Sequence, residues 1–179
     1  MSAADHGRTG KAVEYLVAAS SILMSGGALN ASTALVDDEG VDLVFHRRDG
    51  TATLGVQVKS RTTDAATIQR GRFLADVRSE TFRPRDDLYI LYVVVDRVDA
   101  VLALLWLVPS RVLAERKAPN SQGRLRFSAS MNPESRDQWS QFRVERQELA
   151  PRILALLDEI EGRRRPGVQG RSSDAGKAL

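Results

Sequence analysis

Residues 40–61 read GVDLVFHRRDGTATLGVQVKSR, and this stretch decides the predicted fold. Two runs of alternating polar and apolar residues flank Asp49-Gly50, a dipeptide typical of a two-residue β-hairpin turn. If the loop consists of those two residues, counting back along both strands places Asp42 opposite Gln57. Directly opposed residues in an antiparallel pair have Cβ atoms about 5 Å apart. The pattern therefore predicts a hairpin that brings a carboxylate beside an amide.

The two faces of this hairpin differ in chemistry. Because side chains two residues apart share a face of a strand, Lys59 joins Asp42 and Gln57 on one side. The opposite face is apolar and predicts a core surface made of Val41, Leu43, Phe45, Leu54, Val56 and Val58.

A helix is predicted before the hairpin, over residues 10–24. Thr9 can cap its start, and Gly26-Gly27 can end it. Glu14 sits at the edge of its apolar stripe. That stripe consists of Val13, Leu16, Val17, Ser20, Leu23 and Met24.

The rest of the chain predicts an α/β sandwich with a mixed sheet and flanking helices. A strand at 28–36 and an acidic turn at 37–40 precede the hairpin strands at 41–48 and 51–61, giving a three-stranded meander. The apolar runs at 88–95 and 101–108 are typical of buried strands. For residues 62–78 we favour a strand followed by a helix. Further elements are expected as a helix at 110–117, an edge strand at 125–130, a helical turn at 133–142 and a helix at 147–161.

Composition limits the classes of protein. The 179 residues are 42% hydrophobic and 27% charged, which is typical of a soluble globular domain, and we place that domain at residues 1–161. Residues 162–179 have a net charge of +4 and predict a basic disordered tail, whereas the body has a net charge of −1. No apolar run approaches the roughly 20 residues that a bilayer requires. We therefore expect a cytoplasmic protein without a membrane partner.

Several common chemistries are excluded by residue type. The chain has no cysteine and only two histidines, which argues against a thiolate zinc site and against Cys–His or Ser–His nucleophiles. It also lacks a glycine-rich phosphate loop. Oxygen-donor and lysine chemistry remain, and they concentrate in the hairpin.

Three segments, GKAVEYLV at 10–17, GVDLVF at 40–45 and VQVKS at 56–60, resemble the PD-(D/E)xK nuclease superfamily. The similarity is greatest to the branch of Holliday-junction resolvases and some homing endonucleases, in which Q-x-K replaces E-x-K. By this resemblance Asp42 is the acid of the second strand, Lys59 is the motif lysine, and Glu14 is the extra acid of the first helix. Two departures are Val41 in place of the proline and a neutral Gln57 in place of an acid. The resemblance implies a restriction-endonuclease-like α/β core.

The same resemblance implies a metal-dependent endonuclease that hydrolyses DNA phosphodiester bonds. Mg²⁺, with Mn²⁺ as a substitute, suits hard oxygen ligands and supplies a nucleophilic water. The implied ligands are the side chains of Glu14, Asp42 and Gln57 and the backbone carbonyl of Val58, and the first three join Lys59 as catalytic residues.

The resemblance also implies roles in water activation and in DNA contact for Lys59 and the two residues that follow it. Lys59 would orient or help deprotonate the attacking water, or stabilise the phosphorane-like state. Ser60 and Arg61 directly follow it and would contact phosphate. A homodimer or larger homo-oligomer is expected, because cutting both strands of a DNA duplex requires two active sites.

Other interpretations stay open. Because Gln57 is neutral, a weakly active or inactive domain of the same fold that binds nucleic acid or a protein partner is the alternative. A small α/β interaction module without a nucleic-acid role is a third. The acidic cluster at 37–39 predicts a solvated turn or an additional metal ligand. Five arginines could follow a nucleic-acid backbone along the connection before the buried strands: Arg70, Arg72, Arg78, Arg83 and Arg85.

Overall fold

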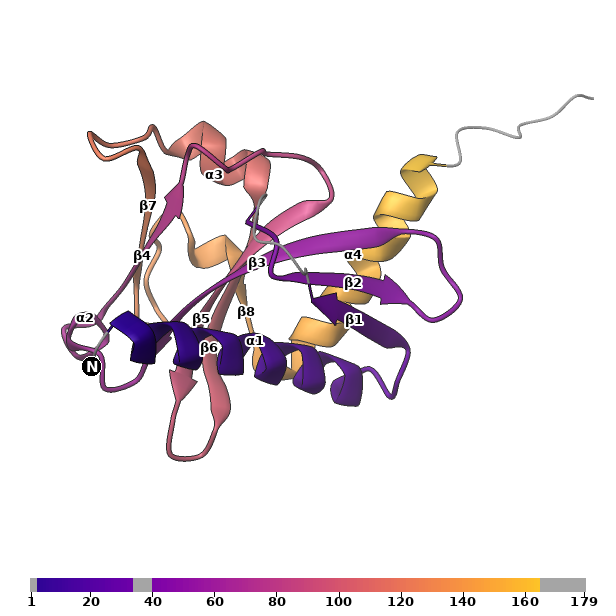
Figure 1. Cartoon of the computed structure of the whole chain (residues 1–179), viewed down its shortest axis with the longest axis horizontal. Helices are drawn as coiled ribbons and strands as arrows, with labels where there is room; N and C mark the ends of the chain where they lie inside the picture. Colours follow the sequence, from indigo (N-terminus) through magenta and orange to yellow (C-terminus); the bar gives the residue numbers. More distant parts are fainter. Residues whose placement is uncertain (1–2, 34–39, 165–179) are drawn as a thin grey trace, which may run out of the picture.

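A six-stranded sheet in the order β1-β2-β3-β5-β6-β8 forms the centre of the computed structural model, which describes residues 3–33 and 40–164 (Figure 1). A second sheet consists of β4 and β7. The elements are α1 (Ala3–Met24), β1 (Leu29–Thr33), β2 (Leu43–Arg47), β3 (Thr53–Thr62), α2 (Ala66–Gln69), β4 (Arg72–Arg78), β5 (Leu88–Asp96), β6 (Val101–Pro109), α3 (Ser110–Arg116), β7 (Arg124–Ser130), η1 (Ser140–Phe142), β8 (Arg143–Val144), η2 (Arg146–Glu148) and α4 (Leu149–Arg164).

The main sheet is mixed. Strands β1, β2 and β3 form an antiparallel meander, β3 runs parallel to β5, and β6 returns antiparallel to β5. The parallel pair requires the long crossover that contains α2 and β4. The predicted fold class, α/β with a mixed sheet, an N-terminal helix and flanking helices, is confirmed.

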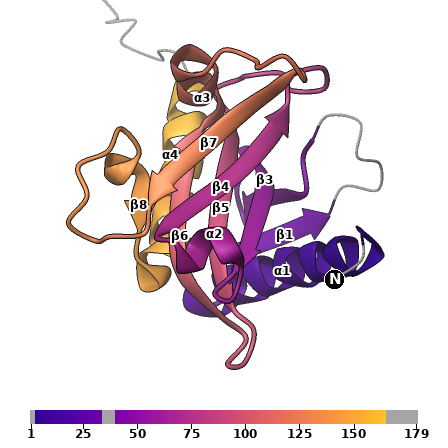
Figure 2. The same cartoon turned by 90° about the vertical axis from the view of Figure 1, so that its left-hand side faces the viewer.

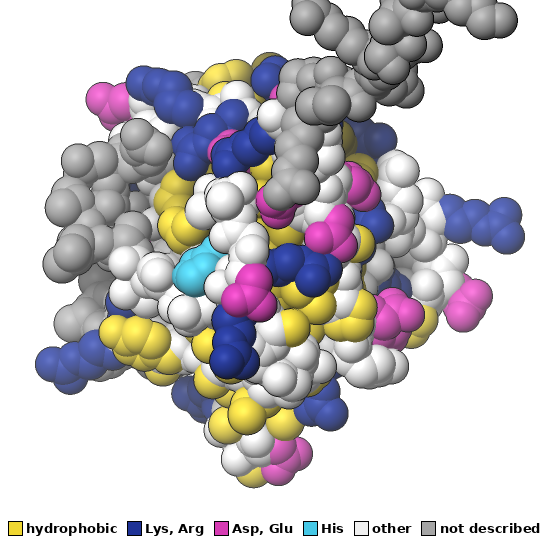
Figure 3. Space-filling model, turned by 90° about the vertical axis from the view of Figure 1, so that its right-hand side faces the viewer, with side chains coloured by type: hydrophobic (Ala, Val, Ile, Leu, Met, Phe, Trp, Pro, Cys, Tyr) yellow, Lys and Arg dark blue, Asp and Glu magenta, His cyan; other side chains and the backbone are white. Residues whose placement is uncertain are grey.

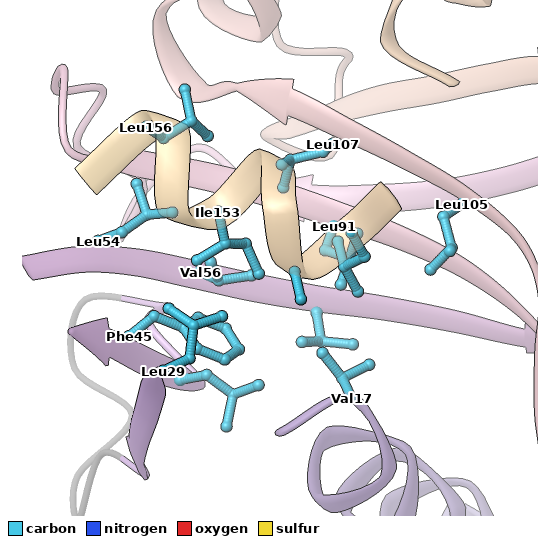
Figure 4. Packing of buried hydrophobic residues seen from close by; sticks show 14 of the residues in the cluster. Val17, Leu29, Phe45, Leu54, Val56, Leu91, Leu105, Leu107, Ile153 and Leu156 are labelled. Atoms are coloured by element: carbon cyan, nitrogen blue, oxygen red, sulfur yellow. The ribbon is translucent and has the colours of Figure 1, made fainter. Parts of the chain in front are cut away.

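Helices α1 and α4 cover one face of the main sheet. Val17 of α1 is fully buried in this core. Figure 4 shows Ile153 and Leu156 of α4 facing Leu54 and Val56 of β3. The alternation of β3 predicted these inward positions, because every second side chain points to the helix layer.

The β4–β7 sheet covers the opposite face, as Figure 2 shows. Phe127 of β7 stacks on Tyr92 of β5 with ring centroids 3.6 Å apart, and it also contacts Trp106 and Trp139. Both tryptophans are fully buried core residues. The sequence did not predict this second sheet. The order expected for residues 62–78 is wrong, since α2 precedes β4.

The hairpin keeps the predicted register but not the predicted turn. Leu43 pairs with Val56, as the Asp-Gly count requires. However, the Gly50 amide donates to the Arg47 carbonyl at 3.4 Å, and Gly50 lacks the positive φ that a type I′ turn needs. The connection is therefore wider, and β3 begins at Thr53.

Both terminal helices are longer than expected. Helix α1 begins at Ala3, because Ala3 and Ala4 favour helix and extend it past the expected Thr9 cap. Leu23 is 79% exposed rather than core-facing, and Met24 is exposed as well. Helix α4 continues to Arg164, past the expected tail boundary at 162. The acidic cluster at 37–39 and residues 165–179 lie outside the described residues.

Among the described helices, none has the length and apolar character that crossing a bilayer requires.

Candidate functional site

The candidate site lies where β3 loses its neighbour β2. The β2–β3 ladder ends at Leu43 and Val56, whereas β3 remains paired with β5 through Thr62. Gly40, at φ +66°, redirects the chain just before β2. Within the described ranges, the second half of β3 therefore has a free edge beyond Val56.

Gln57 and Lys59 line one cavity of about 240 Å³ beside this edge. Strands β4 and β7 supply its opposite wall, and Figure 2 shows β4 next to β3. The lining residues are Gly40, Gln57, Lys59, Asp76, Arg78, Thr81 and Arg124.

Gln57 is a buried polar side chain with no hydrogen bond to any part of the chain that the structure describes. It is only 8% exposed. Its amide lies against Gly40, where an added Cβ would come within 2.6 Å of Nε2. Buried amides are normally hydrogen-bonded, because leaving them unpaired is unfavourable. Because Gln57 lines the cavity, its amide is accessible to a ligand.

Lys59 is the positively charged residue that β3 contributes to the cavity. No ion pair engages it among residues 3–33 and 40–164. It follows Gln57 by two residues and therefore projects from the same face of β3. An amine and an amide thus reach the cavity from one strand.

Asp42 does not pair with Gln57 as the register predicted. Its backbone amide donates to the Val56 carbonyl at 3.0 Å, so it departs from the ladder that ends at Leu43. Its Oδ2 instead accepts a hydrogen bond from the Val58 amide at 2.6 Å. The carboxylate therefore lies at the peptide bond between Gln57 and Val58.

Glu14 approaches from α1, on the helix-covered side of the sheet. Its side chain is only 14% exposed, and its Oε2 accepts a hydrogen bond from Lys11 Nζ at 2.7 Å. The hydrogen bond to Glu14 raises the pKa of Lys11, and the charge of Asp42 adds to the effect. Lys11 was missed from the sequence, although its spacing of three residues from Glu14 allows this pair.

The four predicted catalytic residues are thus near β3 but not in one cavity. Gln57 and Lys59 line it, whereas Asp42 and Glu14 are not among the described residues that do. Asp42 joins the two sides: its carboxylate binds the β3 backbone, and its charge acts on Lys11 of α1.

Ser60 and Arg61, the predicted phosphate contacts, lie on different faces of β3. Arg61 is exposed and shares the face of Lys59, and its charge contributes to lowering the pKa of Asp76. Ser60 alternates to the face covered by α1. Only Arg61 therefore extends the row of polar side chains along the cavity.

The candidate ligands for a divalent cation are oxygen donors, although they do not share one cavity. Asp42 and Glu14 are carboxylates whose combined negative charge already raises the pKa of a neighbouring amine. Neutral carbonyl oxygens from Gln57 and Val58 are the remaining donors, and oxygen ligands suit Mg²⁺. Among the described residues, no three or more His, Cys, Asp or Glu side chains are grouped so that they could hold a metal ion.

The far wall of the cavity was missed. Asp76 accepts two hydrogen bonds from Arg126, and Arg124 and Arg78 lie beside it. The available signal was the alternation of charged and apolar residues within 72–78 and 124–130, which is typical of half-exposed strands.

No protein-family model matches the sequence, and no curated protein matches it either. The fold is similar to that of a bacterial homing endonuclease, I-Ssp6803I. The sequences are 19% identical, the TM-score is 0.47, and the alignment covers 83% of this chain and 91% of that one. At this level of similarity, no residue role is transferred from that protein to this chain.

Proposed function

We propose that this protein is a metal-dependent endonuclease that hydrolyses phosphodiester bonds in DNA. The observation that carries the proposal is the cavity that Gln57 and Lys59 line together from one face of β3. The Asp42 carboxylate is fixed on the peptide that follows Gln57. An acid, an amide and an amine around one strand match the donors that phosphodiester hydrolysis uses.

The residues that would hold Mg²⁺ or Mn²⁺ are Asp42, Glu14, Gln57 and the carbonyl of Val58. A bound divalent ion supplies Lewis-acid stabilisation of phosphate charge and a water of lowered pKa. The hydrogen bond from the Val58 amide keeps the Asp42 carboxylate oriented toward β3. Lys11 would give up part of its interaction with Glu14 when a cation binds.

Lys59 would act on the phosphate or on the attacking water. Its amine reaches the cavity without an ion pair in the described part of the chain, so its charge is available to substrate. Negative charge builds on the nonbridging oxygens during hydrolysis, and a fixed ammonium stabilises it. Arg61 lies two residues farther along the same face and would contact a neighbouring phosphate.

A second candidate function is DNA binding without cleavage. Gln57 favours it, because a neutral amide replaces the acid that the resembled superfamily usually has. Such a domain would retain the cavity and its cations, and it would bind DNA with a strong salt dependence.

A cleavage assay with a panel of linear, branched and single-stranded DNA separates the two functions. We expect cleavage that requires Mg²⁺ or Mn²⁺ and that falls at least a hundredfold in Asp42→Ala and Lys59→Met. Lys117→Met, which removes a lysine outside the cavity, is the matched control. DNA binding without metal-dependent cleavage would support the second function, and cleavage that survives both substitutions would contradict the proposed site.

A further inference from the structure

The outer face of the β4–β7 sheet carries four arginines and one aspartate. We propose that Arg78 and Arg124 bind the phosphate backbone of a DNA substrate beside the cavity, with Asp76 as a positioning residue. This inference rests on the proposed function, because it assigns the substrate-holding surface of the same site.

The pairing of β4 with β7 places these arginines on one surface. Arg78 pairs with Arg124, and Asp76 pairs with Arg126. The alternate residues Phe73, Ala75 and Val77 of β4 and Leu125, Phe127 and Ala129 of β7 are buried against the main sheet. Since side chains alternate along a strand, the charged positions all point outward. The core therefore fixes the orientation of the basic surface.

Asp76 organises the arginines around it. Its carboxylate accepts hydrogen bonds from Arg126 Nε at 2.9 Å and Nη2 at 3.2 Å, while Arg124 Nη1 stays at 4.0 Å. The hydrogen bonds from Arg126 lower the pKa of Asp76. Arg78 has no carboxylate partner in the described ranges. The face thus carries one acid and four arginines, which leaves an excess of positive charge.

Arg78 and Arg124 line the cavity together with Gln57 and Lys59. A phosphate held by these arginines would therefore lie at the same cavity as the two β3 side chains. Guanidinium groups match phosphate oxygens with two parallel hydrogen bonds, which makes arginine suited to holding a nucleic-acid backbone. Contacts to phosphate do not depend on the base sequence, so these arginines are assigned to the backbone and not to base recognition.

Three arginines on other elements are each paired with one acid. Arg47 donates to Asp158, Arg97 donates to Asp64 and Arg111 pairs with Asp86. On the face seen in Figure 3, acidic and basic side chains are interspersed. On β4 and β7, by contrast, four arginines share Asp76, which is the one carboxylate of these two strands.

Fluorescence anisotropy with a labelled DNA duplex in EDTA tests the proposal without cleavage. Each phosphate contact contributes about 0.9 to the slope of log affinity against log salt concentration. We expect Arg78→Gln/Arg124→Gln to reduce that slope by about 1.8. Arg152→Gln/Arg163→Gln removes the same charge from α4, across the main sheet, and should change the slope much less. Equal slopes in the two double variants would overturn the proposal. Thermal melts confirm that both variants fold.

Asp76→Asn tests the positioning role. If Asp76 only weakens attraction to DNA, removing its charge tightens binding. The proposal expects weaker binding, because the arginines lose their anchor, and recovery in Asp76→Glu. Tighter binding in Asp76→Asn would contradict the positioning role.

The experiments distinguish failure of the arginine contact from failure of the proposed nuclease function. Cleavage with Mg²⁺ and an unchanged slope in Arg78→Gln/Arg124→Gln would leave the nuclease standing and overturn the arginine contact. A reduced slope without any cleavage would support the arginine contact and overturn the nuclease.

Discussion

The Asp42 carboxylate accepts a hydrogen bond from the backbone amide of Val58 at 2.6 Å. This contact satisfies an amide at the point where β3 has lost its β2 partner, and it places a charged group beside Gln57. One side chain therefore ends a ladder and supplies a candidate metal ligand. The two roles can be separated by substitution.

Asp42→Ala should lose both roles, whereas Asp42→Asn should lose only the charge. An unpaired, largely buried amide costs about 1–3 kcal/mol, and Asn retains an oxygen that can accept from Val58. We expect Asp42→Ala to lower the free energy of unfolding by that amount in urea titrations, and Asp42→Asn by less than half of it. Both variants should lose cleavage. Equal destabilisation would indicate that the Val58 hydrogen bond contributes little.

Gln57→Glu should strengthen cation binding. It adds a carboxylate of nearly the same shape, and opposite charges about 4 Å apart attract by several kcal/mol at an effective dielectric of about 20, before desolvation. We expect the Kd for Mn²⁺, measured by calorimetry, to fall roughly tenfold. Gln57→Leu should raise it. An Mn²⁺ affinity that is the same in all three proteins would show that Gln57 is not a ligand.

Gly40→Ala should reduce activity beyond its effect on stability. Gly40 has φ +66°, and an added Cβ would lie 2.6 Å from Gln57 Nε2. Gly27→Ala is the matched control, since Gly27 has φ +79° and nothing within 4 Å. Both should cost about 1–2 kcal/mol of stability through left-handed backbone strain. Only Gly40→Ala should displace the Gln57 amide and reduce cleavage per folded molecule. An equal loss of cleavage in both variants would contradict this.

The contribution of Asp76 to stability should depend on pH. Its pKa is lowered mainly because Arg126 hydrogen-bonds the carboxylate. A lowered folded-state pKa gives stability that is fully present above the unfolded pKa of about 4 and is lost as pH falls through the folded value. Wild type should therefore exceed Asp76→Asn by about 1 kcal/mol at pH 7. This difference should disappear in urea titrations carried out under strongly acidic conditions. A difference that does not change with pH would assign the effect to packing.

The sequence predicted the parts of the fold that depend on local alternation. Leu43 opposes Val56 because the alternating apolar residues of both strands must face the same core. The position of Asp42 could not be predicted in this way. Its departure from the ladder depends on Gly40 and on the free edge of β3, and neither appears in a count from the turn.

The β4–β7 sheet could not be predicted from local sequence patterns, because its two strands are far apart in the chain. Asp76 and Arg126 are 50 residues apart in the chain, and their strands pair only because both bury alternate residues on the main sheet. The helix preference assigned to part of residues 62–78 ignored the period of two in Phe73, Ala75 and Val77. The far wall of the candidate site was therefore missing from the sequence interpretation, although Arg78 was noted as part of a basic segment.

The assembly of the cavity from β3 and β7 has a consequence for how the site is made. During synthesis the segment with Gln57 and Lys59 leaves the ribosome long before Arg124 does. The β7 wall packs on β5 and β6, so the complete cavity requires these intervening strands as well. A nascent or truncated chain that ends before β7 would therefore contain Gln57 and Lys59 without the opposite wall of the cavity.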